Sequence, residues 1–519
     1  MLSLQEKYWI NRSWFAKPWL STEAIIGYSL MAVIILPYVS VIASIDDIST
    51  VKSVISDLAS NRVMSLIGSS LLLSLFVAIG STGLGFILAA CVIFSKSVLF
   101  TRSLLIAGGL TYSVSPVVLL SAWQAIPWTQ GIAPLWSSVA VFTWSYFPIS
   151  LLVILLAIRN MEPSGLECAR LASRSYQIIR FIVLPQLKQP VLISACIVFL
   201  FVFMQSEVPS LLSYPVYAEE FMARLILEDT LGSAVVLALP MMMVTLLILP
   251  VLVWNGKLLL SISWKTNGIK VLQEILQAVS LLGVLSLFIL LVLAIPMLIL
   301  FLGSGFTDFI SANGRAILSS LALAIPSSLI AIVLAHLVVE GIVALRGIGR
   351  ATYIGLIVFQ ILMPGALLGL GMISLSHWPG MRWLNTQDLL LIITHALRIL
   401  PFLLLFLLGL RWRQSSERVR EFTMMEVGWL RRQLHIRLPE ERFGLFIAGA
   451  LGFVLVLSEL STTVLVIAPG TETAILRLYN LMHYGDWPTV SALALAQALM
   501  VIAIILAISF VGINSRDKG

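Results

Sequence analysis

Charged side chains are scarce in this sequence. Only 11% of its 519 residues are Asp, Glu, Lys or Arg, whereas 59% are hydrophobic and the mean hydropathy is +1.03. Soluble domains usually carry about 25% charged residues, so this composition excludes an ordinary soluble protein. Continuous apolar runs of roughly 20 residues recur along the chain, and each can cross a bilayer as a helix. Strands of a β-barrel would alternate instead. We therefore expect an all-α polytopic membrane protein.

Cysteines and catalytic motifs are also scarce. The three cysteines, Cys91, Cys168 and Cys196, have no disulfide or metal-ligand spacing, and the five histidines are scattered. No Gly-x-x-x-x-Gly-Lys-[Ser/Thr] phosphate loop is present. The Gly-rich run 80–85 lacks Lys and lies in an apolar segment, where small residues suit helix packing. We expect no catalytic activity, metal or cofactor in this chain itself.

The hydropathy pattern predicts twelve spans, six in each half of the chain. They are expected at 24–44, 66–95, 103–124, 135–157, 190–212 and 233–254, and then at 277–303, 316–339, 352–374, 387–409, 444–468 and 489–511. Lys and Arg concentrate in alternate loops, most densely in 411–442, and the opposite loops are acidic. Positive loops remain in the cytoplasm, so both termini are expected there. The net charge of +7 reflects this topology rather than nucleic-acid binding.

The two halves repeat each other in sequence. Pro116, Pro148, Ser206-Glu207 and Ser69-Ser70-Leu71 match Pro364, Pro401, Ser458-Glu459 and Ser319-Ser320-Leu321, at offsets of 248, 253, 252 and 250 residues. Collinear matches at a nearly constant offset indicate a duplicated six-helix unit. With six spans in each unit, the halves insert the same way up and are related by a pseudo-twofold axis along the membrane normal. We expect one half at 1–256 and the other at 257–519.

Two polar loops, each after the fourth span of its half, share one pattern. The loop at about 160–188 contains Glu167-Cys168-Ala169 and Ser173 and ends with Leu184-Pro185, and the loop at about 411–442 contains Glu421 and Gly428 and ends with Leu438-Pro439. A short helix in such a loop can dock on a partner, because small residues allow close approach and Ser or Gly permits a turn. Proline then begins the next span, where its missing N–H costs nothing. A solvated loop that only sets topology is the simpler reading.

These loops resemble the signature loop of ABC-importer permeases, which reads Glu-Ala-Ala, three residues, Gly, then Ile-x-Leu-Pro. Cys168 and Ser173 replace Ala and Gly in the first copy, and Gly428 stands one position late in the second. Including the repeat, nearly the whole chain is similar to the fused twelve-span permeases of ferric-iron and thiamine importers. The region from Ser458 to Thr473 and the run Arg398-Ile399-Leu400-Pro401 also fit those proteins.

The resemblance implies a type I ABC importer permease fold in a bacterial inner membrane. It implies two copies of a separate ATPase subunit on the cytoplasmic face, which bind ATP and Mg, and an extracytoplasmic solute-binding protein. The solute would be small, such as ferric iron, thiamine or a polyamine. The alternative is a twelve-span secondary transporter driven by an ion gradient. Its usual Gly-x-x-x-Asp-Arg-x-Gly-Arg-Arg-like loop is absent between the second and third spans.

Three ionisable side chains lie inside predicted spans, where charge is costly. Arg398 in the tenth span and Glu459 in the eleventh lie at similar depth, so they can form an ion pair. Glu207 in the fifth span has Ser145 at the position equivalent to Arg398, so it needs another partner or shares Arg398. The three residues either line the translocation path or its outer gate, or they fix the packing of the helices.

Overall fold

The computed structural model describes most of the chain as helices. The described ranges are 22–43, 60–94, 115–124, 129–159, 163–227, 231–260, 306–344, 348–386, 388–412 and 433–516, with isolated positions between some of them. Within these ranges every regular element is a helix. The predicted seventh span, 277–303, lies outside them.

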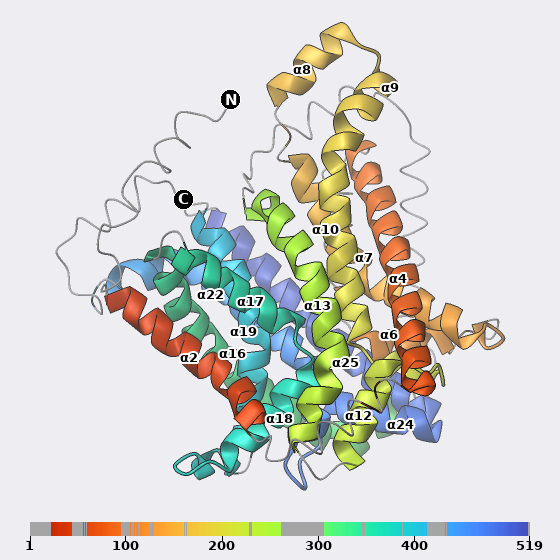
Figure 1. The fold of residues 1–519 in the computed structure, drawn as a ribbon, viewed down its shortest axis with the longest axis vertical. Helices are drawn as coiled ribbons and strands as arrows, with labels where there is room; N and C mark the ends of the chain where they lie inside the picture. The colour runs from red at the N-terminus through yellow and green to blue at the C-terminus, as the bar shows by residue number, and fades with distance from the viewer. Residues whose placement is uncertain are drawn as a thin grey trace.

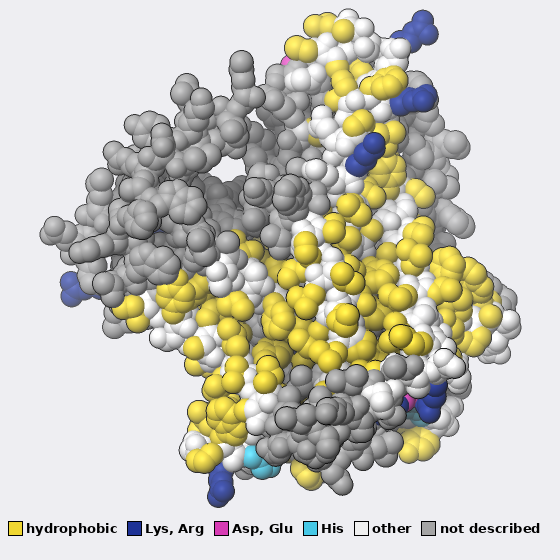
Figure 2. All heavy atoms as spheres, viewed as in Figure 1, with side chains coloured by type: hydrophobic (Ala, Val, Ile, Leu, Met, Phe, Trp, Pro, Cys, Tyr) yellow, Lys and Arg dark blue, Asp and Glu magenta, His cyan; other side chains and the backbone are white. Residues whose placement is uncertain are grey.

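Five described helices are long and apolar enough to cross a membrane. They are Asn61–Ala90, Pro134–Ile158, Arg180–Phe203, Asn313–Ile342 and Leu389–Arg411, and a bent pair, Thr352–Ile361 with Gly365–Ser376, adds a sixth if it is one span. Shorter apolar helices occur at Gly27–Ala43, Val236–Leu252 and Thr489–Ile504. Hydrophobic side chains cover the middle of the face in Figure 2, and Lys and Arg lie towards its ends. The prediction of a polytopic helical membrane protein is confirmed at this level.

The long helices pack in two groups, and the four helices of each group are in contact in the same order. In the first group, α4 (Asn61–Phe94) packs on α7 (Pro134–Arg159) and α10 (Leu184–Phe203), and α13 (Leu231–Leu260) packs on α10. In the second, α16 (Phe306–Ala344) packs on α19 (Leu389–Trp412) and α22 (Leu438–Leu457), and α25 (Trp487–Arg516) packs on α22. The first described helix, α2 (Thr22–Ala43), packs on α16 and α18 (Gly365–Ser376) of the second group (Figure 1).

One hydrogen bond recurs in both groups. The Ser70 hydroxyl accepts from the Tyr217 amide, 2.8 Å away, where α12 (Tyr217–Leu227) begins. The Ser320 hydroxyl accepts from the Ala474 amide, 2.7 Å away, where α24 (Ala474–Tyr484) begins. Each serine satisfies an amide in the first turn of a helix, which has no partner within the helix itself. The matching serines of the sequence repeat therefore occupy matching structural positions.

Helix breaks interrupt three of the predicted spans. The predicted span 352–374 is broken near its middle, because α17 (Ile348–Leu362) and α18 meet at an angle of 102°. Proline lacks the N–H that would continue the helix, and Pro364 lies at this break. Spans 190–212 and 444–468 are each divided as well. Short helices α11 (Glu207–Leu211) and α23 (Ser461–Val466) follow the long α10 and α22 after a turn. Earlier in the chain, α6 (Pro116–Gln124) begins at Pro116, the counterpart of Pro364 in the sequence repeat.

A close backbone contact joins α2 to α18. The Ser40 hydroxyl donates to the Gly371 carbonyl at 2.7 Å, and the Ser374 hydroxyl donates to the Ser40 carbonyl at 3.2 Å. A Cβ atom at Gly371 would overlap the Pro37 carbonyl. Only glycine permits this approach. The contact holds α2 against the broken span of the second group.

Candidate functional site

The predicted ion pair between Arg398 and Glu459 is present at the break between α17 and α18. Arg398 is the tenth residue of α19, so it lies about 14 Å along that helix from its start. Its Nε atom lies 3.6 Å from Glu459 Oε2, and the two side chains are 15% and 16% exposed. Its Nη1 atom donates to the Met363 carbonyl at 2.9 Å. Arg398 therefore satisfies a carbonyl that the Pro364 break leaves free, and it neutralises a mostly buried carboxylate.

Glycine at the break gives these charged groups room. A Cβ atom on Gly365 would stand 3.2 Å from Glu459 Oε1 and 3.4 Å from Arg398 Nε. The Glu459 carboxylate also accepts from the Thr462 amide at 3.2 Å. The turn between α22 and α23 thus presents Glu459 to Arg398 with its lone pairs satisfied from two sides.

Glu207 takes its partners from a different set of groups. It begins α11, and its Oε1 atom accepts from the Ser461 hydroxyl at 2.9 Å. The side-chain amide of Gln205, oriented to satisfy both groups, also donates to the Glu207 carboxylate. Arg398 and Glu459 are close enough for their charges to act on Glu207. Arg398, Glu459 and Glu207 thus belong to one cluster, which we name the charged centre. In it, Ser461 of the second group contacts Glu207 of the first.

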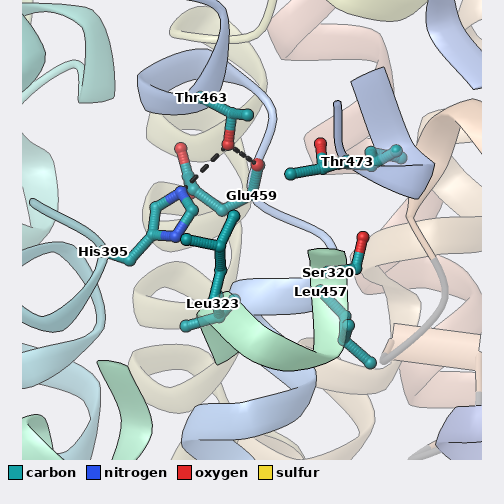
Figure 3. Close-up of a pocket in the computed structure, with 9 residues that line it drawn as sticks. Ser320, Leu323, His395, Leu457, Glu459, Thr463 and Thr473 are labelled. Atoms are coloured by element: carbon teal, nitrogen blue, oxygen red, sulfur yellow. Dashed lines mark hydrogen bonds between the residues drawn. The ribbon is translucent and has the colours of Figure 1, made fainter. Parts of the chain in front are cut away.

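A small cavity lies beside Glu459. His395 Nε2 lies 2.9 Å from the Thr463 hydroxyl, which donates to the Glu459 carbonyl at 2.6 Å (Figure 3). The cavity measures about 10 Å³ and is lined by Ser320, Leu323, His395, Val456, Leu457, Glu459, Thr463, Thr473 and Ile475. That volume holds about one water molecule. It has no room for a solute.

The first polar loop projects beyond the helices that precede and follow it. Helix α8 (Pro163–Ala172), α9 (Ser175–Ile178) and the π-helical turn η2 (Ile179–Val183) form its outer end (Figure 1). Glu167, Cys168 and Ser173 are exposed and Ala169 is half-buried. Ser173 separates α8 from α9. Leu184 and Pro185 are also exposed, and they begin α10.

An apolar residue and several cations accompany these side chains. Leu171, on α8, is 91% exposed. Arg174, Arg180 and Lys188 are exposed nearby in the sequence.

In the second polar loop, the structure describes mainly the residues from Gln433 onward. Glu421 and Gly428 lie outside the described residues, so their predicted role is not tested. The π-helical turn η4 (Gln433–Arg437) leads into α22, whose first residues are the half-buried Leu438 and the exposed Pro439. Both loops therefore end in a π-helical turn followed by a helix with proline in its first turn.

A buried ionic cluster that joins the two ends of the second loop to α16 could not be predicted from the sequence. It consists of His336 and Glu340 on α16, Arg411 on α19, Gln433 and Arg437 in η4, and Glu441 on α22. Arg411 Nη1 lies 2.7 Å from Glu340 Oε1, and Arg411 Nη2 donates to Glu441 Oε2 at 3.0 Å. We name this set the ionic joint. Glu340 directly follows the predicted span 316–339, and this charge was the signal that could have revealed the joint.

Burial and charge both act on Glu441 at the start of α22. Burial raises the pKa of its carboxyl group, but the hydrogen bond to His336 and the charge of Arg411 outweigh it. The pKa of Glu441 is therefore lower than its usual value of 4.5. The carboxylate form is favoured, as an ion pair with Arg411 requires.

Within the described ranges, no group of three or more His, Cys, Asp or Glu side chains could hold a metal ion. The sequence matches no protein-family model and no curated protein. The positions of the charged centre and of the two polar loops are therefore the observations that bear on function.

Proposed function

We propose that this chain is the permease subunit of an ATP-driven, binding-protein-dependent ABC importer. The observation that carries the proposal is the projecting segment from α8 to η2. It places Glu167, Cys168 and Leu171 in solvent beyond the end of two long apolar helices. Two copies of an ATPase subunit would dock on this segment and on its counterpart at 411–442. ATP and Mg would be bound by those partners.

The repeated helix order supports two equivalent halves, 1–256 and 257–519. The second half repeats the helix order of the first. Helices α22, α23, α24 and α25 correspond to α10, α11, α12 and α13, and each has a similar length to its counterpart. The serine contacts at the starts of α12 and α24 are the same. We propose twelve spans around a pseudo-twofold axis in a bacterial inner membrane, with both termini in the cytoplasm.

The charged centre is the proposed outer gate of the translocation path. Ser461 and Glu207 join the two groups of helices there, and Arg398 pairs with Glu459 beside them. A path that opens alternately to each side must separate such contacts. A solute-binding protein on the outer face would release ferric iron, thiamine, a polyamine or a similar small solute into the opened path.

Uptake measurements test this function against the gradient-driven alternative. Cells with and without the chain are given radiolabelled ferric iron, thiamine or putrescine. Each uptake is measured after the ion gradients are collapsed and, separately, after ATP is depleted. We expect uptake of one solute to require the chain and ATP and to survive collapse of the gradients. Gradient-driven uptake by the purified chain alone would contradict the proposal.

A further inference from the structure

The ionic joint connects two parts of the second helix group. One side consists of α16 and α19, which carry Glu340 and Arg411, and the other consists of η4 and α22, which carry Arg437 and Glu441. Across the joint, Arg411 Nε lies 3.0 Å from Glu441 Oε1 and Arg437 Nε lies 3.6 Å from Glu340 Oε1. The side chains of these four residues are at most 10% exposed.

Each side of the joint also holds a pair of its own. Arg411 Nη1 lies 2.7 Å from Glu340 Oε1, both on the α16–α19 side. Arg437 Nη1 lies 3.9 Å from Glu441 Oε1, and both residues are on the η4–α22 side. Each side carries one guanidinium and one carboxylate among these four residues. If the two sides separate, each charge keeps a partner, so the cost of a stranded buried charge is avoided.

The contact between His336 and Gln433 connects the same two sides. His336 Nε2 lies 2.9 Å from Gln433 Oε1, and this contact crosses from α16 to η4. It is a polar contact that water can replace when the sides part. Opening at this end of α22 would therefore expose polar and charged groups. Farther along the helix, Gly449 and Gly452 pack on apolar side chains of α16 and α19.

The first helix group has an apolar joint at the equivalent place. With the offsets of the sequence repeat, Phe86, Ala90, Ile158, Val183 and Leu187 correspond to His336, Glu340, Arg411, Arg437 and Glu441. Ile158, Val183 and Leu187 are buried in one apolar cluster, and Phe86 packs against it. Opening this joint would expose apolar surface to water, which is unfavourable.

We propose that the ionic joint is a built-in opening point, at which η4 and α22 part from α16 and α19, while the apolar joint of the first group stays closed. This inference rests on the proposed transport function, since it assigns the moving element of the cycle. The last part of the second polar loop is η4, which is followed directly by α22. Movement of that loop would therefore reach the joint through a short helical connection. The two halves would then move unequally.

The test uses the full-length chain alone in lipid nanodiscs, with native cysteines removed by Cys91→Ala, Cys168→Ala and Cys196→Ala. Spin labels are attached to Val333→Cys and Phe446→Cys across the ionic joint. The matched pair, Gly83→Cys and Leu192→Cys, spans the apolar joint at equivalent positions. All four sites are exposed, and an added Cβ at Gly83 meets nothing within 4 Å. Distance distributions are measured by pulsed electron spin resonance.

We expect two distances across the ionic joint and one across the apolar joint. The decisive variant gives the second joint the residues of the first: His336→Phe, Glu340→Ala, Arg411→Ile, Gln433→Ile, Arg437→Val and Glu441→Leu. Buried ion pairs can often be replaced by apolar residues without loss of stability, so this variant is expected to fold. It should show one distance. A milder variant, Arg437→Val with Glu441→Leu, removes both charges from one side and should also favour the closed distance.

A single distance across the ionic joint, like that across the apolar joint, would overturn the inference. Two distances that persist in the apolar variant would overturn it as well. If the six-residue variant does not fold, the two label pairs in the otherwise unchanged chain and the milder variant still decide. The measurement needs no ATPase, so failure of the proposed function would be seen separately, as absence of ATP-dependent uptake.

Discussion

Ser461 donates a hydrogen bond to Glu207, 2.9 Å away, although the two residues are separated by 254 positions in the chain. Each lies in the short helix that follows a long one, Glu207 in α11 and Ser461 in α23. Glu207 has no arginine at the position that provides Arg398 to Glu459, and a hydroxyl from the other helix group takes that place. The contact therefore connects the two halves at the proposed gate.

Removal of this hydroxyl tests the connection. Ser461→Ala leaves a mostly buried carboxylate with one donor fewer, so we expect the free energy of unfolding to fall by about 1–3 kcal/mol. Ser458→Ala is the matched control, because the Ser458 hydroxyl donates to the Val454 carbonyl of its own helix. Its effect should stay within about 0.5 kcal/mol. Equal melting temperatures for the two variants would show that the Glu207 contact contributes nothing.

Arg398 has two partners, the Glu459 carboxylate and the Met363 carbonyl. A double variant can show how much of the stability comes from the ion pair. Arg398→Met removes both the charge beside Glu459 and the donor to the Met363 carbonyl. Breaking a buried pair by removing one partner costs about 3–5 kcal/mol, because the other charge is left unpaired. The double variant Arg398→Met, Glu459→Gln should regain part of that stability. Denaturation in detergent measures both, and a double variant less stable than the single one would contradict the pairing.

Gly371 tests the packing of α2 on α18. Gly371→Ala places a methyl group against the Pro37 carbonyl, so α2 must shift and the chain should melt at a lower temperature. Gly409→Ala is the control, since an added Cβ there meets nothing within 4 Å inside a helix. Alanine favours helices over glycine, so the control should be stabilised by up to about 1 kcal/mol. A Gly371→Ala protein as stable as this control would show that α2 adjusts freely.

Acid should weaken the ionic joint. Since the pKa of Glu441 is lowered in the folded state, its contribution to stability is complete above its unfolded value, near 4.5. That contribution is lost as the pH falls through the lower, folded-state value. Melting temperatures between pH 7 and 3 should therefore decline less in Glu441→Gln than in the unaltered chain. Glu440→Gln, at an exposed neighbouring position, should retain the full decline. Identical slopes for Glu441→Gln and the unaltered chain would contradict the ion pair.

The helical membrane fold could be predicted because apolar runs report directly on the bilayer. The pairing of Arg398 with Glu459 could also be predicted, since charges at one depth on successive spans must find each other. The contact of Glu207 with Ser461 could not, because it depends on how the two groups meet. Proline at position 364 predicts a kink in its span, but the size of the bend could not be predicted, since hydropathy carries no angle.

The ionic joint escaped prediction for a related reason. Its members are spread over about 100 residues on α16, α19, η4 and α22, and each one alone resembles a charge at the edge of a span. Only their packing shows that they neutralise one another. The contrast with the apolar joint becomes visible once the repeat aligns the two halves.

The most direct test of the central claim is whether an ATPase accompanies the chain. The tagged protein is purified from its native membranes in mild detergent, and Mg-dependent ATP hydrolysis and subunit ratio are measured. We expect two ATPase copies per chain, and loss of both hydrolysis and partner in the double variant Glu167→Lys, Glu421→Lys, with its melting temperature unchanged. A chain that transports solute yet is purified without any ATP hydrolysis would contradict the account.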